Sequence, residues 1–438
     1  MADTAPAHDL HAQALLAHEA GRGAEALELL QRAARGAVDA ELMNDLAVVT
    51  AGQGDIEAAA DLLRGLLALS PENHVARDNL DQLGNPAGEL RDRLLQTVLE
   101  CRAERPLDNL DHFFAPMGVE LPDPDSEGAR LSELLELLPR MACFWQRLGD
   151  DSSREVFVRF LAHRVLGPVH VRLQLEPGEY RGAIQLLNAR LMEKPNALPL
   201  PGIPLEWMFN LYDLRPAGVP VRVIGQPLPL ASTFVLGQYA YRDGAVDARP
   251  RPGDVALDVG GCWGDTALFL AAAVGPEGRV ISFEPAPANR EILSMNLALN
   301  PELAPRIQVC DSPASSRAGD TVYIPNRVSA GATVRVKREG DDMVALQTVT
   351  IDGLVAAGTI PRVDFLKVDV EGADLGVLEG AAETIRSMRP RLALACYHKP
   401  DDLATLPGFV NSLGVEYRWY LQCSTMTTVD TVAFGVPV

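Results

Sequence analysis

The feature that most constrains the fold is an apolar segment that runs directly into a glycine-rich turn and then into a helical pattern. Residues 255–259 have the sequence Val-Ala-Leu-Asp-Val, glycines follow at 260, 261 and 264, and residues 265–274 are rich in Ala and Leu. This order of strand, turn and helix start is typical of the nucleotide site of doubly wound sheets, where free backbone N–H groups face the ligand. We therefore expect a ligand site here. The alternative is a sharp turn that binds nothing.

A second marker is a carboxylate at the end of the next predicted strand. Residues 279–285 have the sequence Arg-Val-Ile-Ser-Phe-Glu-Pro, which places Glu284 26 residues after Asp258. A carboxylate at this position can accept hydrogen bonds from both hydroxyls of a ribose. Glu284 is therefore a candidate nucleoside ligand, with capping of the helix predicted near Pro287 as the alternative.

Cys262 excludes the dinucleotide fingerprint G-x-G-x-x-G, which needs a glycine at that position. The remaining pattern, D-x-G-x-x-x-G, resembles the first motif of class I S-adenosylmethionine (SAM) methyltransferases. The resemblance implies SAM as cofactor, with S-adenosylhomocysteine (SAH) as its product. The candidate cofactor-binding residues are Asp258, Gly260, Gly261, Cys262, Trp263, Gly264, Asp265, Thr266, Glu284, Asn289, Asp311, Asp369, Tyr239 and Tyr241.

Strand and helix patterns alternate regularly from Gly253 onward. Such alternation predicts a parallel sheet with helices on both faces. The last two predicted strands, near 416–422 and 429–436, have too few residues between them for a crossover helix, so they must form an antiparallel hairpin. The predicted fold is α/β, with a Rossmann-like seven-stranded methyltransferase sheet of six parallel strands and one antiparallel strand. Strands are expected at 255–259, 279–284, 306–310, 363–369 and 391–397, and helices at 265–274, 287–299, 374–388 and 401–413.

The segment 364–381 resembles one particular family among the class I SAM methyltransferases. It contains Lys-Val-Asp-Val-Glu-Gly, followed by a helical pattern that ends in Gly-Ala, and it is similar to the signature of FkbM-type methyltransferases. The similarity extends from about Phe209 to the C-terminus. It implies methyl transfer from SAM to a hydroxyl of a sugar, of a polyketide or peptide natural product in secondary metabolism, or of another small metabolite. N-methylation of a small molecule is the alternative.

Transfer to a hydroxyl requires a base that removes the hydroxyl proton. His398 and Asp369, at the ends of two predicted strands, are the candidate catalytic residues. The ordinary imidazole pKa of about 6.5 slightly favours His398, while Asp369 could instead hold SAM. Glu371 and Tyr397 are expected near the acceptor. Lys367, on the same side of its predicted strand as Asp369, is a third candidate there, and it either pairs with a carboxylate or is simply a buried lysine with its hydrogen bonds satisfied.

The residues before the predicted catalytic domain (251–438) divide into three parts. Residues 1–84 are helical, and the pattern of 20–30 returns at 51–63. This displacement of about 31 to 33 residues resembles the tetratricopeptide period of about 34, with a plain helical hairpin as the alternative. Residues 85–168 are expected to be a helical linker region. Residues 169–250 are expected to be a cap with strands at 170–175, 219–224 and 232–236.

Composition restricts the partners. The net charge of −20 argues against nucleic acid and anionic membranes, and the six scattered cysteines lack zinc spacing, so no metal is expected. There is no signal-peptide pattern and no apolar run of about 18 residues. We expect a cytoplasmic enzyme that acts on a small-molecule or carrier-bound hydroxylated acceptor. Its N-terminal helices could bind a protein partner or a second copy of the chain.

Three other functions compete with this interpretation. An NAD-dependent dehydrogenase would need the glycine that Cys262 replaces. An amino-methylating enzyme of nucleic acids would carry [DNS]-P-P-[YFW] after the strand at 363–369, and the sequence has none there. A non-catalytic SAM-binding adaptor, acting through the N-terminal repeats, is the main alternative to an enzyme.

Overall fold

The computed structural model describes residues 7–20, 22–35, 39–83, 86–104, 123–200, 208–243, 246–331, 333–338, 340 and 342–438. Its centre is a seven-stranded sheet with the order β13-β14-β12-β11-β6-β7-β8. Strand β14 is antiparallel to both of its neighbours, and the other pairings are parallel. The predicted sheet of six parallel strands and one antiparallel strand is confirmed. The strands are β6 (Val255–Val259), β7 (Arg279–Phe283), β8 (Ile307–Cys310), β11 (Phe365–Val368), β12 (Arg391–Ala395), β13 (Tyr417–Cys423) and β14 (Thr431–Pro437).

Helices cover both faces of this sheet because successive side chains of each buried strand point to opposite faces. In β11, Leu366 and Val368 belong to one core, while Phe365 belongs to the other. The predicted helix 374–388 is divided near Gly380, where an added Cβ would meet the backbone oxygen of Ser315 at 2.0 Å. The helices of this region are α11 (Asp265–Val274), α12 (Pro287–Ala298), α13 (Ile351–Ala356), α14 (Asp374–Glu379), α15 (Ala382–Met388) and α16 (Asp402–Ser412).

Three helices from the expected linker region pack beside the β13 edge of the sheet. They are α6 (Pro86–Ala103), α7 (Glu127–Arg147) and α8 (Asp151–Leu166). Their apolar side chains share one core with the sheet, and the rings of Phe144 and Trp419 meet edge-on at 5.8 Å. The backbone N–H of Gly149 also donates to the carbonyl oxygen of Trp419 at 2.8 Å. These helices therefore form a further layer on the core of the seven-stranded sheet.

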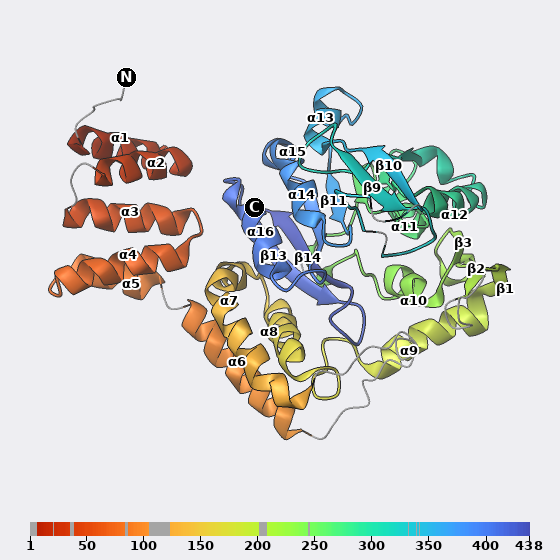
Figure 1. Cartoon of the computed structure of the whole chain (residues 1–438), viewed down its shortest axis with the longest axis horizontal. Coiled ribbons are helices and arrows are strands. Elements are labelled where there is room, and N and C mark those ends of the chain that lie inside the picture. Colours follow the sequence, from red (N-terminus) through yellow and green to blue (C-terminus); the bar gives the residue numbers. More distant parts are fainter. Residues whose placement is uncertain are drawn as a thin grey trace.

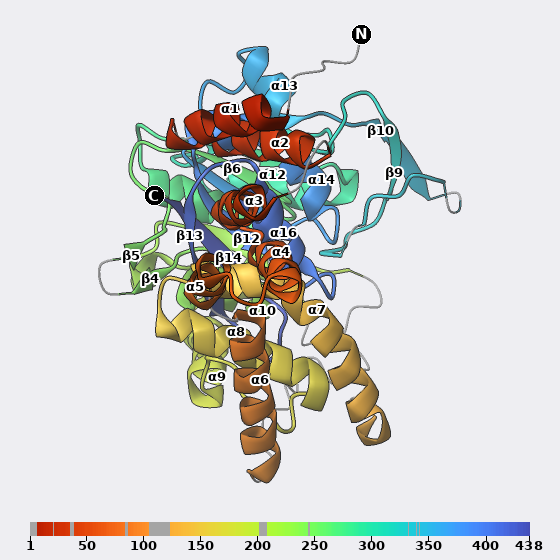
Figure 2. The ribbon, with the colours of Figure 1, turned by 90° about the vertical axis from the view of Figure 1, so that its left-hand side faces the viewer.

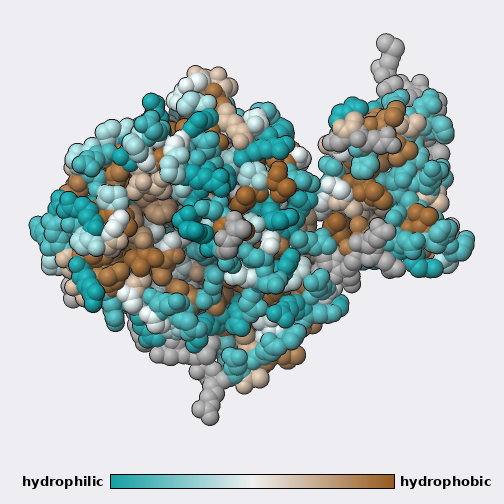
Figure 3. Space-filling model, turned by 180° about the vertical axis from the view of Figure 1, so that it is seen from behind, coloured by the Kyte–Doolittle hydropathy of each residue, from teal (hydrophilic) through white to brown (hydrophobic). Residues whose placement is uncertain are grey.

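Five further helices form a separate lobe at the N-terminal side (Figures 1 and 2). They are α1 (Ala7–Glu19), α2 (Gly23–Ala34), α3 (Ala40–Gly52), α4 (Ile56–Leu69) and α5 (His74–Leu83). They bury two apolar clusters of their own, around Leu30 and Leu63. Asp39 and Asp55 cap α3 and α4 by accepting backbone N–H bonds. Figure 3 shows this lobe projecting from one side of the rest of the molecule.

The cap region differs from the prediction in two places. Residues 170–175 are irregular, and residues 232–236 lie mainly in a π-helical segment (Ala231–Val235) that continues α10 (Pro227–Leu230). A short apolar run fits a helix as well as a strand, and Pro227 at the first helical turn decides for the helix. The cap also holds α9 (Pro177–Leu186) and a sheet of β1 (Met192–Leu198), β2 (Phe209–Asp213) and β3 (Arg222–Gly225), the last overlapping the strand predicted at 219–224.

Two small hairpins complete the fold: β4 (Arg242–Asp243) with β5 (Val246–Asp247), and β9 (Thr321–Pro325) with β10 (Met343–Gln347). The second hairpin lies on the irregular segment between β8 and β11. Within the described ranges, no helix is long and apolar enough to cross a membrane.

Candidate functional site

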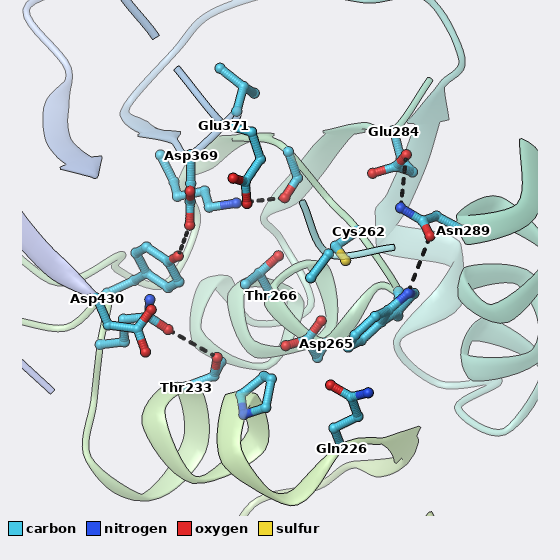
Figure 4. A pocket seen from close by; sticks show the side chains of 18 of the residues that line it. Gln226, Thr233, Cys262, Asp265, Thr266, Glu284, Asn289, Asp369, Glu371 and Asp430 are labelled. Atoms are coloured by element: carbon cyan, nitrogen blue, oxygen red, sulfur yellow. Dashed lines mark hydrogen bonds between the residues drawn. The ribbon is translucent and has the colours of Figure 1, made fainter. Parts of the chain in front are cut away.

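A cavity of about 390 Å³ opens at the carboxyl ends of the central parallel strands (Figure 4). This is the edge at which open α/β sheets bind ligands, and the volume suits a small organic molecule. The cap contributes Gln226, Thr233 and Gln238 to its wall, and the β9–β10 region contributes Ile324 and Val334. Twelve of the residues predicted from the sequence line it: Tyr239, Gly260, Cys262, Trp263, Asp265, Thr266, Glu284, Asn289, Lys367, Asp369, Glu371 and Tyr397.

The glycine turn fits closely against the end of β11. Gly260 has φ +95°, and an added Cβ would stand 1.9 Å from the backbone oxygen of Asp369. Gly264, with φ +84°, is the N-cap of α11, so the first turn of this helix, with Asp265 and Thr266, faces the cavity. Backbone N–H groups at a helix start attract negative groups of a ligand.

Asp258 lies beneath the turn and does not line the cavity. Its carboxylate accepts hydrogen bonds from Thr266 Oγ1 at 3.0 Å and Ser282 Oγ at 2.9 Å, and it pairs with Lys367 Nζ at 3.2 Å. Lys367 Nζ also donates to the carbonyl oxygen of Gly260 at 2.6 Å. Burial acts to lower the pKa of Lys367, but the nearby carboxylates outweigh it and raise that pKa. Asp258 therefore shapes the turn, which corrects its expected role as a cofactor contact.

Glu284 lies at the cavity wall just beyond β7. Its Oε1 accepts the backbone N–H of Ala286 at 2.8 Å and a longer bond from Asn289 Nδ2 at 3.5 Å. Burial raises the pKa of Glu284 to about 7. The carboxylate thus fixes the loop before α12 and also lines the cavity, where a nucleoside ligand could reach it, but it does not cap α12, whose N-cap residue Ala286 receives no side-chain cap. Asn289 in turn accepts a bond from Trp263 Nε1 at 3.2 Å.

Asp369 is the centre of a polar cluster at the other side of the cavity. Tyr239 Oη donates to its Oδ2 at 2.6 Å, and Tyr397 Oη lies 3.3 Å from its Oδ1. His398 Nε2 lies 3.2 Å from the same Oδ1. Burial acts to raise the pKa of Asp369, but His398 and Lys367 outweigh it and hold that pKa well below its usual range. Asp369 is therefore an anion whose two oxygens already have partners.

His398 is enclosed by carboxylates and does not line the cavity. Its Nδ1 lies 3.0 Å from Asp374 Oδ2, opposite the contact with Asp369, and only 6% of its side chain is exposed. Burial acts to lower its pKa, but the two neighbouring carboxylates, Asp369 and Asp374, outweigh it and raise the pKa of His398 to about 10. At neutral pH the ring is a cation. This corrects the expectation that His398 is the base, because a base must begin without the proton.

Four other predicted cofactor residues lie outside the cavity wall. Tyr241 Oη donates to Asp150 Oδ2 at 2.5 Å, and its ring stacks on Tyr420. Asp311 is exposed and pairs with Arg290 at 3.2 Å. The remaining two are glycines that pack against neighbouring side chains, Gly261 on Ser282 and Gly264 on Leu293.

Sequence reasoning missed Asp430, which lies between β13 and β14 and lines the cavity. Strand β14 begins at the next residue and runs antiparallel to β12, so its start lies at the carboxyl edge of the parallel strands. The sequence signal that could have identified it is an acidic residue directly before the last predicted strand. No group of three or more His, Cys, Asp and Glu side chains that could hold a metal occurs among the described residues.

Comparison with known proteins agrees with the signature at 364–381. Residues 254–417 match the family model described as the methyltransferase FkbM domain. This confirms the FkbM resemblance for that segment, which does not include the N-terminal helices. The catalytic part of the chain is thus similar to methyltransferases.

Two curated relatives match parts of the chain. The hexuronic acid methyltransferase AglP of Haloferax volcanii is 31% identical over 135 residues, which cover 31% of this chain and 53% of that protein. The methyltransferase sdnD of Sordaria araneosa is 30% identical over 158 residues, covering 29% of this chain and 60% of that protein. The chain therefore spans little more than half the length of these relatives. A solved FkbM methyltransferase from Methylobacillus flagellatus is 19% identical with a TM-score of 0.43, covering 70% of this chain and 61% of that chain.

Proposed function

We propose that this protein is a SAM-dependent methyltransferase. The observation that carries the proposal is one cavity that brings together the glycine turn, the start of α11, Glu284 and Asp369. Glu284 would hold the ribose hydroxyls, and the backbone N–H groups at the start of α11 would hold the methionine carboxylate. SAM, when bound, supplies a methyl group that its sulfonium already activates.

The charge of the cavity supports a cationic cofactor. Five carboxyl groups line it, and Lys367, the lysine among its lining residues, is engaged with Asp258 and with the Gly260 carbonyl. A low-dielectric site with an excess of carboxylates favours a ligand that carries a sulfonium and an ammonium. The cluster of Asp369 and Tyr239 would face the ammonium. The carboxyl groups are Asp265, Glu284, Asp369, Glu371 and Asp430.

For the acceptor we propose a hydroxyl of a sugar, of a natural product or of a similar small metabolite, free or bound to a carrier. The relative AglP is named for methylation of a hexuronic acid, which supports a carbohydrate-like acceptor. The cap and the β9–β10 region, which form the wall beyond the turn, would shape its pocket. N-methylation of an amine is the second candidate, because the acidic lining would also attract a protonated amine.

We propose in addition that the N-terminal lobe docks a protein partner or a second copy of the chain. Its helices leave a groove with Leu27, Met43, Leu46 and Leu62 in its lining, beside the acidic Asp61. Few repeats of a tetratricopeptide type cannot bury such a face alone. Light scattering of the full chain and of a chain that starts at Pro86 would test this, since loss of the lobe should change the oligomeric state or remove partner binding.

The test of the central proposal is methyl transfer from radiolabelled SAM to a panel of acceptors. The panel contains hexuronic acids and their glycosides, neutral sugars, hydroxylated polyketides and primary amines. We expect SAH to form together with a methyl ether, identified by mass and by NMR. A methyl ester or an N-methyl product would contradict the hydroxyl proposal alone. Failure of the protein to bind either SAM or SAH in calorimetry would contradict the methyltransferase proposal itself.

A further inference from the structure

The connection between β13 and β14 places a carboxyl group at the wall of the cavity. Asp430 lines the cavity together with Val429, at the side where Asp369 lies and away from Glu284 (Figure 4). Its φ of +62° is in the left-handed region, which a residue other than glycine seldom adopts. Glu371, on the same wall, also has a positive φ, +54°, so the two carboxylates are distinguished by their surroundings rather than by their backbone.

The neighbours of Asp430 on this side are poorly suited to take a proton. Asp369 receives donors at both oxygens, and its pKa lies well below the usual range. His398 lies between Asp369 and Asp374, and these carboxylates raise its pKa to about 10, so it is a poor acceptor of a proton at neutral pH. Burial holds the pKa values of the Tyr239 and Tyr397 phenols well above their usual range. Glu371 is the rival carboxylate on this side, because burial and the charge of Asp369 raise its pKa, although His398 Nε2 lies 3.9 Å away and opposes that rise.

Asp430 has a different environment. The charges that face it are those of Asp369 and Glu371 after β11 and of His398 after β12. Burial, and then the negative charge of Asp369, raise the pKa of Asp430 to about 7. A base works best when its pKa lies near the working pH, since it is then both available and able to accept the proton.

We propose that Asp430 is the catalytic residue that accepts the proton of the acceptor hydroxyl. The inference rests on the proposed methyltransferase function. In the transfer step the acceptor oxygen forms the new C–O bond, and the S–C bond breaks with its electron pair remaining on sulfur. The hydroxyl proton moves to a carboxylate oxygen of Asp430 and passes from there to water. Asp369 and His398 act as an ion pair that fixes the positions of the side chains on this side of the cavity.

The test compares Asp430→Asn with the wild-type protein and with the control Glu416→Gln. Glu416 is an exposed glutamate directly before β13 and does not line the cavity. We expect Asp430→Asn to lower kcat by about 100-fold or more, and SAH affinity to stay within about threefold. The wild-type kcat should rise with pH through a limb near neutrality, and this limb should vanish in the variant. Independently of activity, NMR of protein labelled at the Asp carboxyl carbons should show a signal that titrates near pH 7 and is missing in Asp430→Asn, while the signal of Asp265, whose pKa burial raises to about 6, should remain in the variant.

A second variant guards against misfolding. Asp430→Gly relieves the positive φ, so it should fold, and added formate should restore part of its activity by replacing the missing carboxylate. Equal kcat in Asp430→Asn and wild type would overturn the inference, as would a larger loss in Glu371→Gln. An SAH affinity lowered more than about tenfold would also overturn it, because Asp430 would then hold the cofactor. A wild-type protein that binds no SAH would instead overturn the proposed function on which the inference rests.

Discussion

The ammonium nitrogen of Lys367 lies 3.2 Å from Oδ1 of Asp258, and the two side chains are 2% and 0% exposed. The same nitrogen donates to the carbonyl oxygen of Gly260 at 2.6 Å. The pair therefore joins the neighbouring strands β11 and β6 beneath the glycine turn. The acidic residue of the first motif and the lysine of the 364–381 signature form one structural unit, which sets the shape of the turn rather than contacting the ligand through Asp258.

Replacement of this lysine tests that unit. Lys367→Met should leave the Asp258 carboxylate buried without its cation, at a cost of about 3–5 kcal/mol in the free energy of unfolding. Denaturant unfolding would measure the change, with Lys194→Met, at an exposed position of β1, as the control. A loss below about 0.5 kcal/mol, the range of ordinary surface substitutions, would show that the pair does not hold the turn.

Two glycines make it possible to distinguish the cost of backbone strain from the cost of a steric clash when alanine replaces them. Gly260 and Gly253 have similar φ values, +95° and +88°, but an added Cβ meets an atom only at Gly260, 1.9 Å from the Asp369 carbonyl oxygen, while Gly253 has nothing within 4 Å. Gly253→Ala should cost about 1–2 kcal/mol from backbone strain alone. Gly260→Ala should cost more and should weaken SAH binding, measured by calorimetry. Equal effects of both changes on stability and on binding would refute the close approach of the two strand ends.

The ion pairs of His398 give a pH dependence of stability. The folded-state pKa of about 10 lies above the ordinary value of 6.5, so the stabilisation is complete below about pH 6.5 and is lost as pH rises toward 10. The wild-type free energy of unfolding should therefore fall more steeply between about pH 7 and pH 10 than that of His398→Gln. Urea unfolding at a series of pH values measures this difference. Parallel curves would mean that the ring is neutral in the folded protein.

Because α6–α8 pack against the sheet, we expect that residues can be removed from the N-terminus up to α6, but not beyond it, without loss of folding. A chain that starts at Pro86 loses the lobe α1–α5 with its own apolar clusters, and it should fold and bind SAH as the full chain does. A chain that starts at Ser152 also loses the contact of Phe144 with Trp419 and the bond from Gly149, so it should be unstable or aggregate. Thermal unfolding and SAH calorimetry of both would decide. A stable, SAH-binding chain from Ser152 would show that these helices are only a linker.

The sheet could be predicted from the sequence because each strand and helix of the catalytic part carries a local pattern. The side-chain environments could not be predicted in this way. His398 depends on two carboxylates, Asp369 and Asp374, that the turn after β11 brings to opposite sides of one ring. Asp430 follows no periodic pattern, since it lies in a connection whose position only the antiparallel β14 fixes. The residues 232–236 were assigned wrongly to a strand because a short apolar run does not distinguish strand from helix.

The most direct test of the account is the affinity for SAH of wild type and of Glu284→Ala, measured by calorimetry. Glu277→Ala, a change at an exposed glutamate before the same strand, is the matched control. We expect one SAH per chain, unchanged affinity in Glu277→Ala, and a loss of about 1.5–3 kcal/mol in Glu284→Ala, which is about 10- to 150-fold in Kd. Unchanged affinity in Glu284→Ala, or no binding of SAH to the wild-type protein, would contradict the assignment of this cavity.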